Sequence, residues 1–134
     1  MAKFIPEELV PRMHADLLHR YGGRPGIRDR NLLASALAQP KMTLGKKFLH
    51  RTVFDKAAAY GFHLCKNHPF VDGNKRTAFV LMVMFLELNG WELSASEEDA
   101  YSAMMAVAHG SSSKRQLAHW LKHHTSRLPS AVVG

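Results

Sequence analysis

Hydrophobic residues recur at helical spacing along most of this chain. Apolar side chains three or four residues apart, the spacing of one helix face, mark the spans 6–20, 30–39, 53–67, 97–108 and 114–124. In the first span the residues expected to form the buried face are Leu9, Met13, Leu17 and Leu18. A further span, RTAFVLMVMFLELNG over residues 76–90, is apolar nearly all round, which is typical of a helix buried on every side.

Residues that begin or end helices fall at the borders of these spans. Asp29 and Thr52 are suited to cap the second and third helices, because their side-chain oxygens can accept a backbone N–H of the first turn. Pro69 follows the third span and disfavours helical backbone in the residue before it. Pro11 lies inside the first span, so that helix either starts there or is kinked. We therefore predict an all-α protein, a compact helical bundle with a buried central helix.

The segment before the third helix breaks the helical pattern. KMTLGKKFLHR, residues 41–51, is polar and cationic and is expected to form a mobile loop or a short hairpin, a flap before the third helix. The edge of an exposed hairpin can pair with an extended peptide. The candidate contacts to a target segment are Thr43, Leu44, Gly45 and Lys46.

The length of 134 residues is that of one domain with a single core, and no internal repeat is present. We assign residues 1–124 to this domain. The remaining stretch, TSRLPSAVVG over residues 125–134, is expected to be a frayed C-terminal tail.

Charge and composition narrow the choice of partners. The net charge of +7 favours acidic partners. The cations are spread over turns and helix ends without interleaved exposed aromatic residues, so direct nucleic-acid binding is not the favoured activity. Cys65 is the only cysteine, which excludes an intramolecular disulfide and a multi-cysteine metal site. No apolar stretch reaches the ~20 residues that a bilayer requires, and no leader segment is evident. We expect a cytoplasmic protein without membrane contact.

The stretch NHPFVDGNKRTAF, residues 67–79, carries the candidate chemistry. Gly73 gives the backbone freedom that a tight turn between two helices requires. The helix that follows presents unpaired N–H groups and the positive end of its dipole, and both favour an anion. Lys75 and Arg76 add positive charge, and the planar fork of Arg76 suits phosphate oxygens. The stretch therefore predicts a polyphosphate site.

Three neighbouring residues extend this prediction. Asp72 offers a hard oxygen ligand for Mg²⁺ bound together with phosphates. Asn74 can orient a phosphate oxygen or cap the helix. His68, with two cations nearby, is expected to be a neutral ring that accepts a proton from a hydroxyl group, as a general base does. Each of these residues alone is more often structural, but their occurrence together favours a catalytic site.

The motif HPFVDGNKR resembles the signature of the Fic/Doc superfamily. YGGRPGIRDRNLLASALAQP and HPFVDGNKRTAFVLMVMFLELNG are similar to its death-on-curing (Doc) toxin branch. The resemblance implies an all-helical fold, ATP and Mg²⁺ as co-substrate and cofactor, and modification of a hydroxyl side chain on a target protein. It matches His68 to the base and Asp72 to the magnesium ligand. The residues matched to the anion hole are Gly73, Asn74, Lys75 and Arg76.

Two departures from the adenylyl-transferring Fic pattern decide which reaction we expect. Lys75 replaces a glycine, and Phe79 stands where a second arginine would clamp phosphate. The lysine variant is that of Doc-type toxins, for which the resemblance implies ATP bound in the opposite sense and transfer of its γ-phosphoryl group. It also implies a Ser/Thr kinase that phosphorylates a threonine of translation elongation factor Tu and blocks translation. An antitoxin partner is implied too, with any nucleic-acid contact made only indirectly through it.

Two alternatives stay open. One is transfer of an adenylyl group (AMP) to a protein hydroxyl. The other is a catalytically dead docking or regulatory domain, against which the intact His68 and Asp72 argue.

Overall fold

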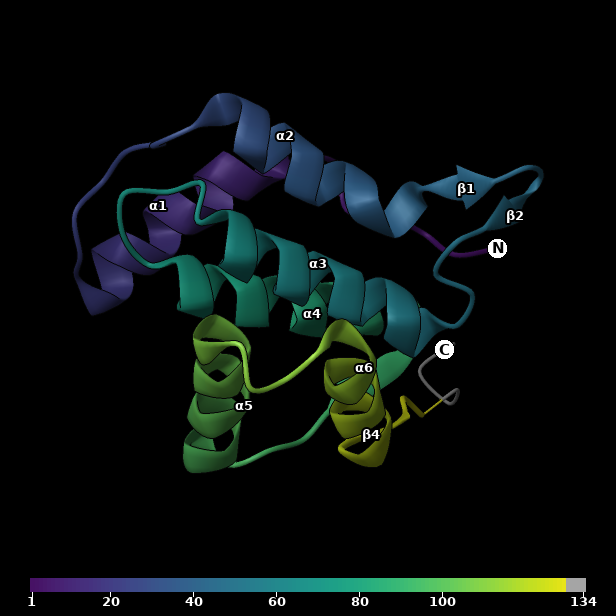
Figure 1. Ribbon diagram of the computed structural model, residues 1–134. Helices are drawn as coiled ribbons and strands as arrows, with labels where there is room; N and C mark the ends of the chain where they lie inside the picture. Colours follow the sequence, from purple (N-terminus) through teal and green to yellow (C-terminus); the bar gives the residue numbers. More distant parts are fainter. Residues whose placement is uncertain (130–134) are drawn as a thin grey trace.

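The computed structural model describes residues 1–129, and helices make up most of this part of the chain (Figure 1). Its α-helices are α1 (Leu9–Tyr21), α2 (Arg30–Ala38), α3 (Val53–Asn67), α4 (Asn74–Leu88), α5 (Glu97–His109) and α6 (Lys114–His123). A 3₁₀ turn, Gln39–Lys41, follows α2. The predicted all-α fold class is confirmed, with two small two-stranded sheets added to it. None of the helices in residues 1–129 has the length and apolar character needed to cross a membrane.

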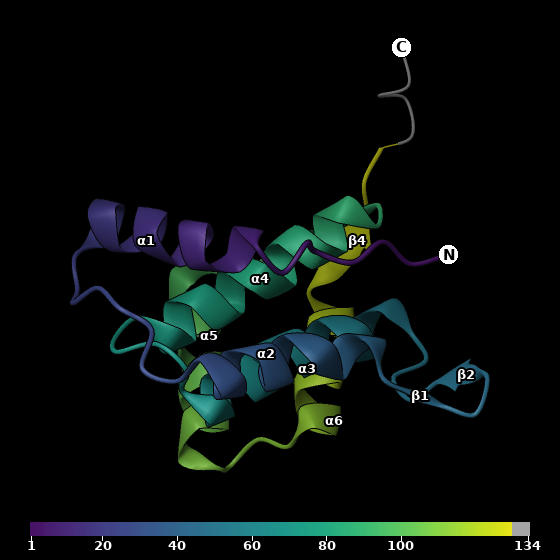
Figure 2. The same cartoon turned by 90° about the horizontal axis from the view of Figure 1, so that it is seen from above.

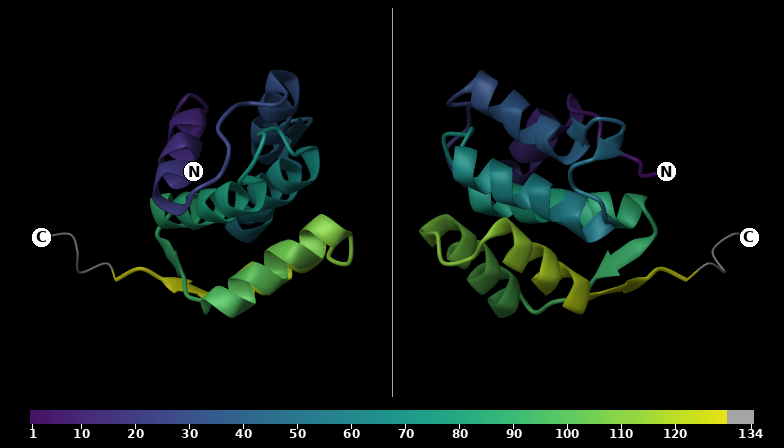
Figure 3. Two further views of the ribbon diagram at one scale, coloured as in Figure 1. Left: turned by 90° about the vertical axis from the view of Figure 1, so that its left-hand side faces the viewer. Right: turned by 45° about the vertical axis from the view of Figure 1, so that its right-hand side comes forward.

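The helices are stacked in three layers. α3 and α4 lie side by side in the middle, α1 and α2 cover one face of this pair, and α5 and α6 cover the other (Figure 1 and Figure 3). Residues 74–88 form α4, in which Leu81, Met82 and Phe85 are fully buried. The predicted buried central helix is confirmed. α3 shares this position, since it packs against α2, α4, α5 and α6.

Small side chains allow α3 to contact so many neighbours. Ala57, Ala58 and Ala59 are completely buried. Gly61 faces α4, and a side chain at this position would collide with the sulfur of Met82. The backbone of α3 can therefore approach the surrounding helices closely, as a core at native packing density requires.

The predicted helix caps are present. Asp29 accepts a hydrogen bond from the backbone N–H of Leu32 at 2.9 Å. Thr52 accepts one from Asp55 N–H at 3.0 Å, while the Asp55 carboxylate accepts the N–H of Thr52 at 3.1 Å. This reciprocal pair is a capping box and fixes the start of α3.

The buried face of α1 differs from the predicted one. Val10 and His14 are buried, whereas Leu9 is 41% exposed. α1 starts at Leu9, so Pro11 falls in its first turn. Backbone N–H groups in the first turn have no partner within the helix, so the N–H that proline lacks is not missed there. Pro11 therefore requires neither a later start of the helix nor a kink. His14 occupies a core position that the spacing of the leucines did not predict.

The cationic segment before α3 forms a short hairpin, one of the two forms predicted for it. β1 (Thr43–Leu44) pairs antiparallel with β2 (Lys47–Phe48) around Gly45, whose φ is 67°. The hairpin projects from the N-terminal end of α3, away from the helices (Figure 2).

The second sheet corrects the prediction of a frayed tail beginning at residue 125. β4 (Thr125–Arg127) pairs antiparallel with β3 (Trp91–Leu93). The guanidinium of Arg127 lies 4.7 Å from the centre of the Trp91 ring, a cation–π contact that adds to the backbone bonds. Order in this segment thus comes from pairing with a distant part of the chain. The rest of the predicted tail, residues 130–134, lies outside the described residues.

Candidate functional site

The motif forms the turn between α3 and α4, at one end of the middle layer (Figure 1). α3 ends at Asn67 and α4 begins at Asn74, so residues 68–73 separate the last carbonyls of one helix from the first N–H groups of the next. His68 is the C-cap of α3 and has a φ of 51°, the one positive φ of a non-glycine residue in the described part of the chain. Helices commonly end in this left-handed conformation.

The backbone of His68 is fixed while its side chain is exposed. Arg28 donates from Nε to the carbonyl of His68 at 2.8 Å and from Nη2 to the carbonyl of Asn67 at 3.0 Å. These bonds satisfy carbonyls at the end of α3, where a cation is also favoured by the helix dipole. The His68 side chain is left accessible at the end of α3 that leads into the turn before α4.

The segment that joins α1 to α2 lies along the motif turn. Ile27 forms an antiparallel bridge with Phe70, and Val71 N–H donates to the carbonyl of Gly26 at 3.0 Å. The carbonyl of Pro69 accepts two more backbone N–H groups of this segment, at 2.6 and 3.0 Å. Sequence reasoning missed the pairing, because backbone bonds between distant segments leave no local pattern. These bonds make the segment part of the site's framework.

Asp72 is held as an exposed carboxylate. Its Oδ2 accepts the N–H of Arg24 at 3.0 Å and its Oδ1 accepts the N–H of Gly73 at 2.8 Å. These two hydrogen bonds, that of Arg24 first, lower the pKa of Asp72 below its ordinary value. The side chain is therefore ionised at neutral pH, and its oxygens have lone pairs left for a cation.

The two residues after Asp72 shape the turn. Gly73 has a φ of 78°, and a Cβ here would come within 3.2 Å of Leu18 Cδ2. Asn74 is only 4% exposed, and its side-chain amide accepts the N–H of Phe70 at 3.0 Å and donates to the carbonyl of Phe70 at 2.9 Å. Neither expected role of the Asn74 side chain, orienting a phosphate oxygen or capping α4, is what it does here. It ties the turn together instead.

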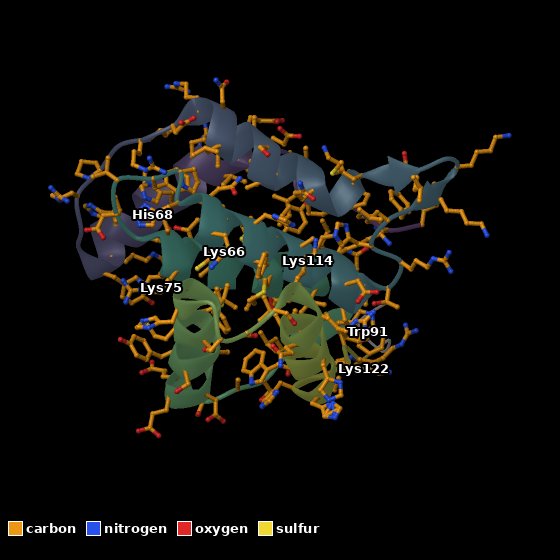
Figure 4. All side chains as sticks on the ribbon, viewed as in Figure 1. Lys66, His68, Lys75, Trp91, Lys114 and Lys122 are labelled. Atoms are coloured by element: carbon orange, nitrogen blue, oxygen red, sulfur yellow. The ribbon has the colours of Figure 1, made fainter. Side chains whose placement is uncertain are left out.

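Lys75 and Arg76 lie exposed in the first turn of α4, which contains no acidic residue. Figure 4 shows Lys75 and His68 at the same end of the molecule. The guanidinium of Arg76 lies 4.4 Å from the centre of the Tyr21 ring at the end of α1. Two cations at a helix N-terminus, the positive end of the helix dipole, are unfavourable unless an anion binds beside them. Phe79, in place of a second arginine, packs against the core.

His14 is a residue of the site that sequence reasoning missed. It is 3% exposed, its ring is stacked on Phe70 with centroids 3.7 Å apart, and its Nε2 lies 2.8 Å from the backbone carbonyl of Asp72. A carbonyl can only accept, so Nε2 donates. One feature of the sequence could have indicated that His14 is buried: it lies between the apolar residues Val10 and Leu17 on one face of a helix.

The candidate docking residues are not brought to the motif. The hairpin with Thr43, Leu44, Gly45 and Lys46 precedes α3, whereas His68 follows it (Figure 1). The 15 residues of α3 separate the two by roughly 22 Å at the usual rise per residue. The hairpin therefore does not cover the site, and a target contacting both would have to span the length of α3.

These residues make up a candidate site with an accessible imidazole, an ionised carboxylate and the positive N-terminus of a helix. A magnesium ion fits the donor set only together with ligand oxygens. Residues 1–129 contain no group of three or more His, Cys, Asp or Glu side chains that could hold a metal ion, whereas Mg²⁺ is commonly bound by one or two carboxylates plus substrate phosphates.

The chain belongs to the Fic/DOC family, whose model matches residues 4–86. It is 43% identical over 75 residues to "Toxin Doc" of Mycolicibacterium smegmatis, a match that covers 56% of this chain and 58% of that protein. It is 31% identical over 98 residues to "Protein kinase doc" of Escherichia phage P1, covering 73% of this chain and 76% of the phage protein. The match thus spans less than two thirds of the mycobacterial relative.

Proposed function

We propose that this protein is a Doc-type toxin that transfers the γ-phosphoryl group of ATP to a Ser/Thr hydroxyl of a target protein. The observation that carries the proposal is the accessible His68 imidazole at the end of α3, beside an α4 N-terminus with Lys75 and Arg76. The name of the phage relative, a protein kinase, supports phosphoryl over adenylyl transfer. So does Lys75, which occupies the position of a motif glycine and would crowd a phosphate that glycine leaves room for.

In the proposed reaction His68 acts as the general base. It accepts the proton of the target hydroxyl as the oxygen forms its bond to the γ-phosphorus and the bond from that phosphorus to ADP breaks. The N–H groups of the first turn of α4, with Lys75 and Arg76, would hold phosphate oxygens. Asn74 contributes through its backbone only, because its side chain is bonded to Phe70.

Asp72 would hold Mg²⁺, whose positive charge would neutralise charge that develops on the phosphates. The bonds from Arg24 and Gly73 keep this carboxylate ionised and oriented, so it needs no rearrangement to meet the ion.

We further infer that the target is translation elongation factor Tu, modified on a threonine so that translation stops. We also infer that an antitoxin binds and inhibits this protein in the cytoplasm, and that any contact with nucleic acid is made through the antitoxin. The net charge of +7 suits an acidic partner.

The test is intact-mass measurement of elongation factor Tu after incubation with this protein, ATP and Mg²⁺. We expect the gain of one phosphoryl group. His68→Asn should abolish it without loss of fold, because asparagine accepts the left-handed conformation of a helix C-cap but is no base. His109→Asn, at the exposed last residue of α5, is the matched control and should leave transfer unchanged.

Other outcomes separate the alternatives. Gain of an adenylyl group would refute phosphoryl transfer. An unmodified factor whose activity is still blocked equally by wild type and His68→Asn would indicate a docking protein. An unmodified factor, together with phosphorylation of another protein in a lysate, would refute the target but not the reaction.

A further inference from the structure

Tyr21, the last residue of α1, has a large aromatic ring that contributes little to the core. The residue is 62% exposed. α1 ends at the same end of the molecule as the motif turn (Figure 1). The Cζ atom of Arg76 lies over the Tyr21 ring, 4.4 Å from its centre. The ring therefore contacts a residue of the candidate site, while most of its surface stays in solvent.

Arg76 is not held by a carboxylate. The first turn of α4 contains no acidic residue, and neither of the two ion pairs within residues 1–129 includes Arg76. An exposed arginine side chain samples many rotamers and loses this freedom when it binds a ligand. In the described part of the chain, the face of Tyr21 takes the place that a carboxylate would have beside this guanidinium.

An aromatic face is better suited than a carboxylate to hold a cation that must bind phosphate. A carboxylate pairs with the N–H groups of a guanidinium, so it would compete with phosphate for them. An aromatic ring attracts the cation through the negative face of its π system and does not neutralise its charge. Arg76 held in this way keeps its positive charge available for an anion at the start of α4.

The position of the ring is set by the same stretch of backbone that holds Asp72. Gly22 ends α1, and its N–H donates to the carbonyl of Leu18 at 2.7 Å. Two residues further on, the N–H of Arg24 donates to Oδ2 of Asp72 at 3.0 Å. Residues 21–24 thus contact both the carboxylate and the guanidinium of the candidate site.

We propose that Tyr21 is a positioning residue, which holds the Arg76 guanidinium ready for the phosphate oxygens of a nucleotide. This role rests on the proposed function, in which Arg76 binds phosphate. A guanidinium that is already restricted loses less freedom on binding, so the nucleotide binds more tightly. The energy of an exposed cation–π contact corresponds to roughly a two- to fivefold change in affinity.

ATP binding in the presence of Mg²⁺ and without a target protein tests this role, with the backbone amides of α4 followed by NMR. Tyr21→Leu keeps an apolar side chain but no π system, and it should weaken ATP binding about threefold. Tyr21→Phe retains the ring and should restore the wild-type affinity. Tyr101→Leu is the matched control, because it removes an equally exposed ring, 65%, from α5 and should leave ATP binding unchanged.

Two further measurements separate positioning from packing. In the Arg76→Gln background, Tyr21→Leu should cause no further loss of affinity, because the ring then has no cation to hold. A ring that served only the packing of α1 would weaken binding by the same factor with and without Arg76. In the free protein, nitrogen relaxation of Arg76 Nε should report a more mobile side chain in Tyr21→Leu than in Tyr21→Phe.

The proposed role is overturned if Tyr21→Leu binds ATP as the wild type does, or if Tyr21→Phe loses as much affinity as Tyr21→Leu. It is also overturned if the loss persists in the Arg76→Gln background. In each of these cases the wild type binds ATP, so the proposed kinase activity is untouched. A wild-type protein that binds no ATP would refute the proposed function and, with it, the role of Tyr21.

Discussion

His14 joins α1 to the motif turn through two contacts of different kinds. Its ring is stacked on Phe70, and its Nε2 donates to the backbone carbonyl of Asp72. The first contact is apolar packing, whereas the second orients the residue proposed to hold Mg²⁺. His14 is therefore a positioning residue, and the two contributions can be separated by substitution.

We predict that His14→Phe, which keeps an aromatic ring but has no donor, lowers the free energy of unfolding by only about 1 kcal/mol, the net value of one hydrogen bond. The Mg²⁺ concentration needed for half-maximal transfer should rise several-fold, because Asp72 is less firmly oriented. His14→Gln retains an N–H donor and should recover part of the Mg²⁺ dependence. A role in packing alone would change the urea midpoint and leave the Mg²⁺ dependence as it is.

At the level of single residues the sequence predicted some parts of the candidate site's arrangement and missed others. The positions of His68, Asp72 and Arg76 near a helix N-terminus were predictable, because local sequence signals mark the end of α3, the turn and the start of α4. The side chain of Asn74 was misassigned and His14 was overlooked, because the contacts of both are set by how the turn packs in three dimensions.

For the helices and strands, too, features set by neighbouring residues were predictable, whereas features set by contacts between distant segments were not. Helix boundaries were predictable, since caps and prolines act within a few residues of where they stand. The β3–β4 pair and the bridge between Ile27 and Phe70 were not, since each joins segments far apart in the chain. The segment that joins α1 to α2 therefore lies beside the motif turn.

Gly26 offers a test of that segment. Its φ is 119°, a conformation that side chains rarely adopt, and a Cβ would come within 3.3 Å of Val71. We predict that Gly26→Ala disturbs the pairing with the motif turn, lowers transfer at least tenfold and speeds hydrogen exchange of the Val71 amide. Gly90→Ala is the control, because Gly90 also has a positive φ, 88°, but has nothing within 4 Å of its position. Equal effects of the two substitutions on transfer would contradict a specific role for the segment.

Considered as a whole, the molecule separates two positively charged regions along its length. One is the start of α4 beside His68, and the other is the start of α6 beside His50 and His63. The middle layer of α3 and α4 holds both in place (Figure 3). Burial of the second region has a consequence for global stability, because its histidines must stay neutral in the folded state.

The folded protein should lose stability as the pH falls from about 6.5 toward 4. In this window the unfolded chain binds protons at His63 and His50, whose ordinary pKa is 6.5, whereas the folded state resists them, since burial lowers both values and that of His63 to about 4. The unfolded state then binds more protons, so the free energy of unfolding decreases with decreasing pH. Above pH 6.5 this loss is absent. Asp72 titrates below this window, because its pKa lies under the ordinary 3.8.

Urea unfolding at pH 7.5, 6.0, 5.0 and 4.5 measures this dependence. His63→Gln keeps an acceptor for Lys114 but does not titrate, so its urea midpoint should fall less steeply than that of the wild type. His109→Gln, at an exposed helix end, should follow the wild-type curve. If His63→Gln and the wild type lost stability in parallel, the neutral, half-buried His63 would not be the source of the acid sensitivity.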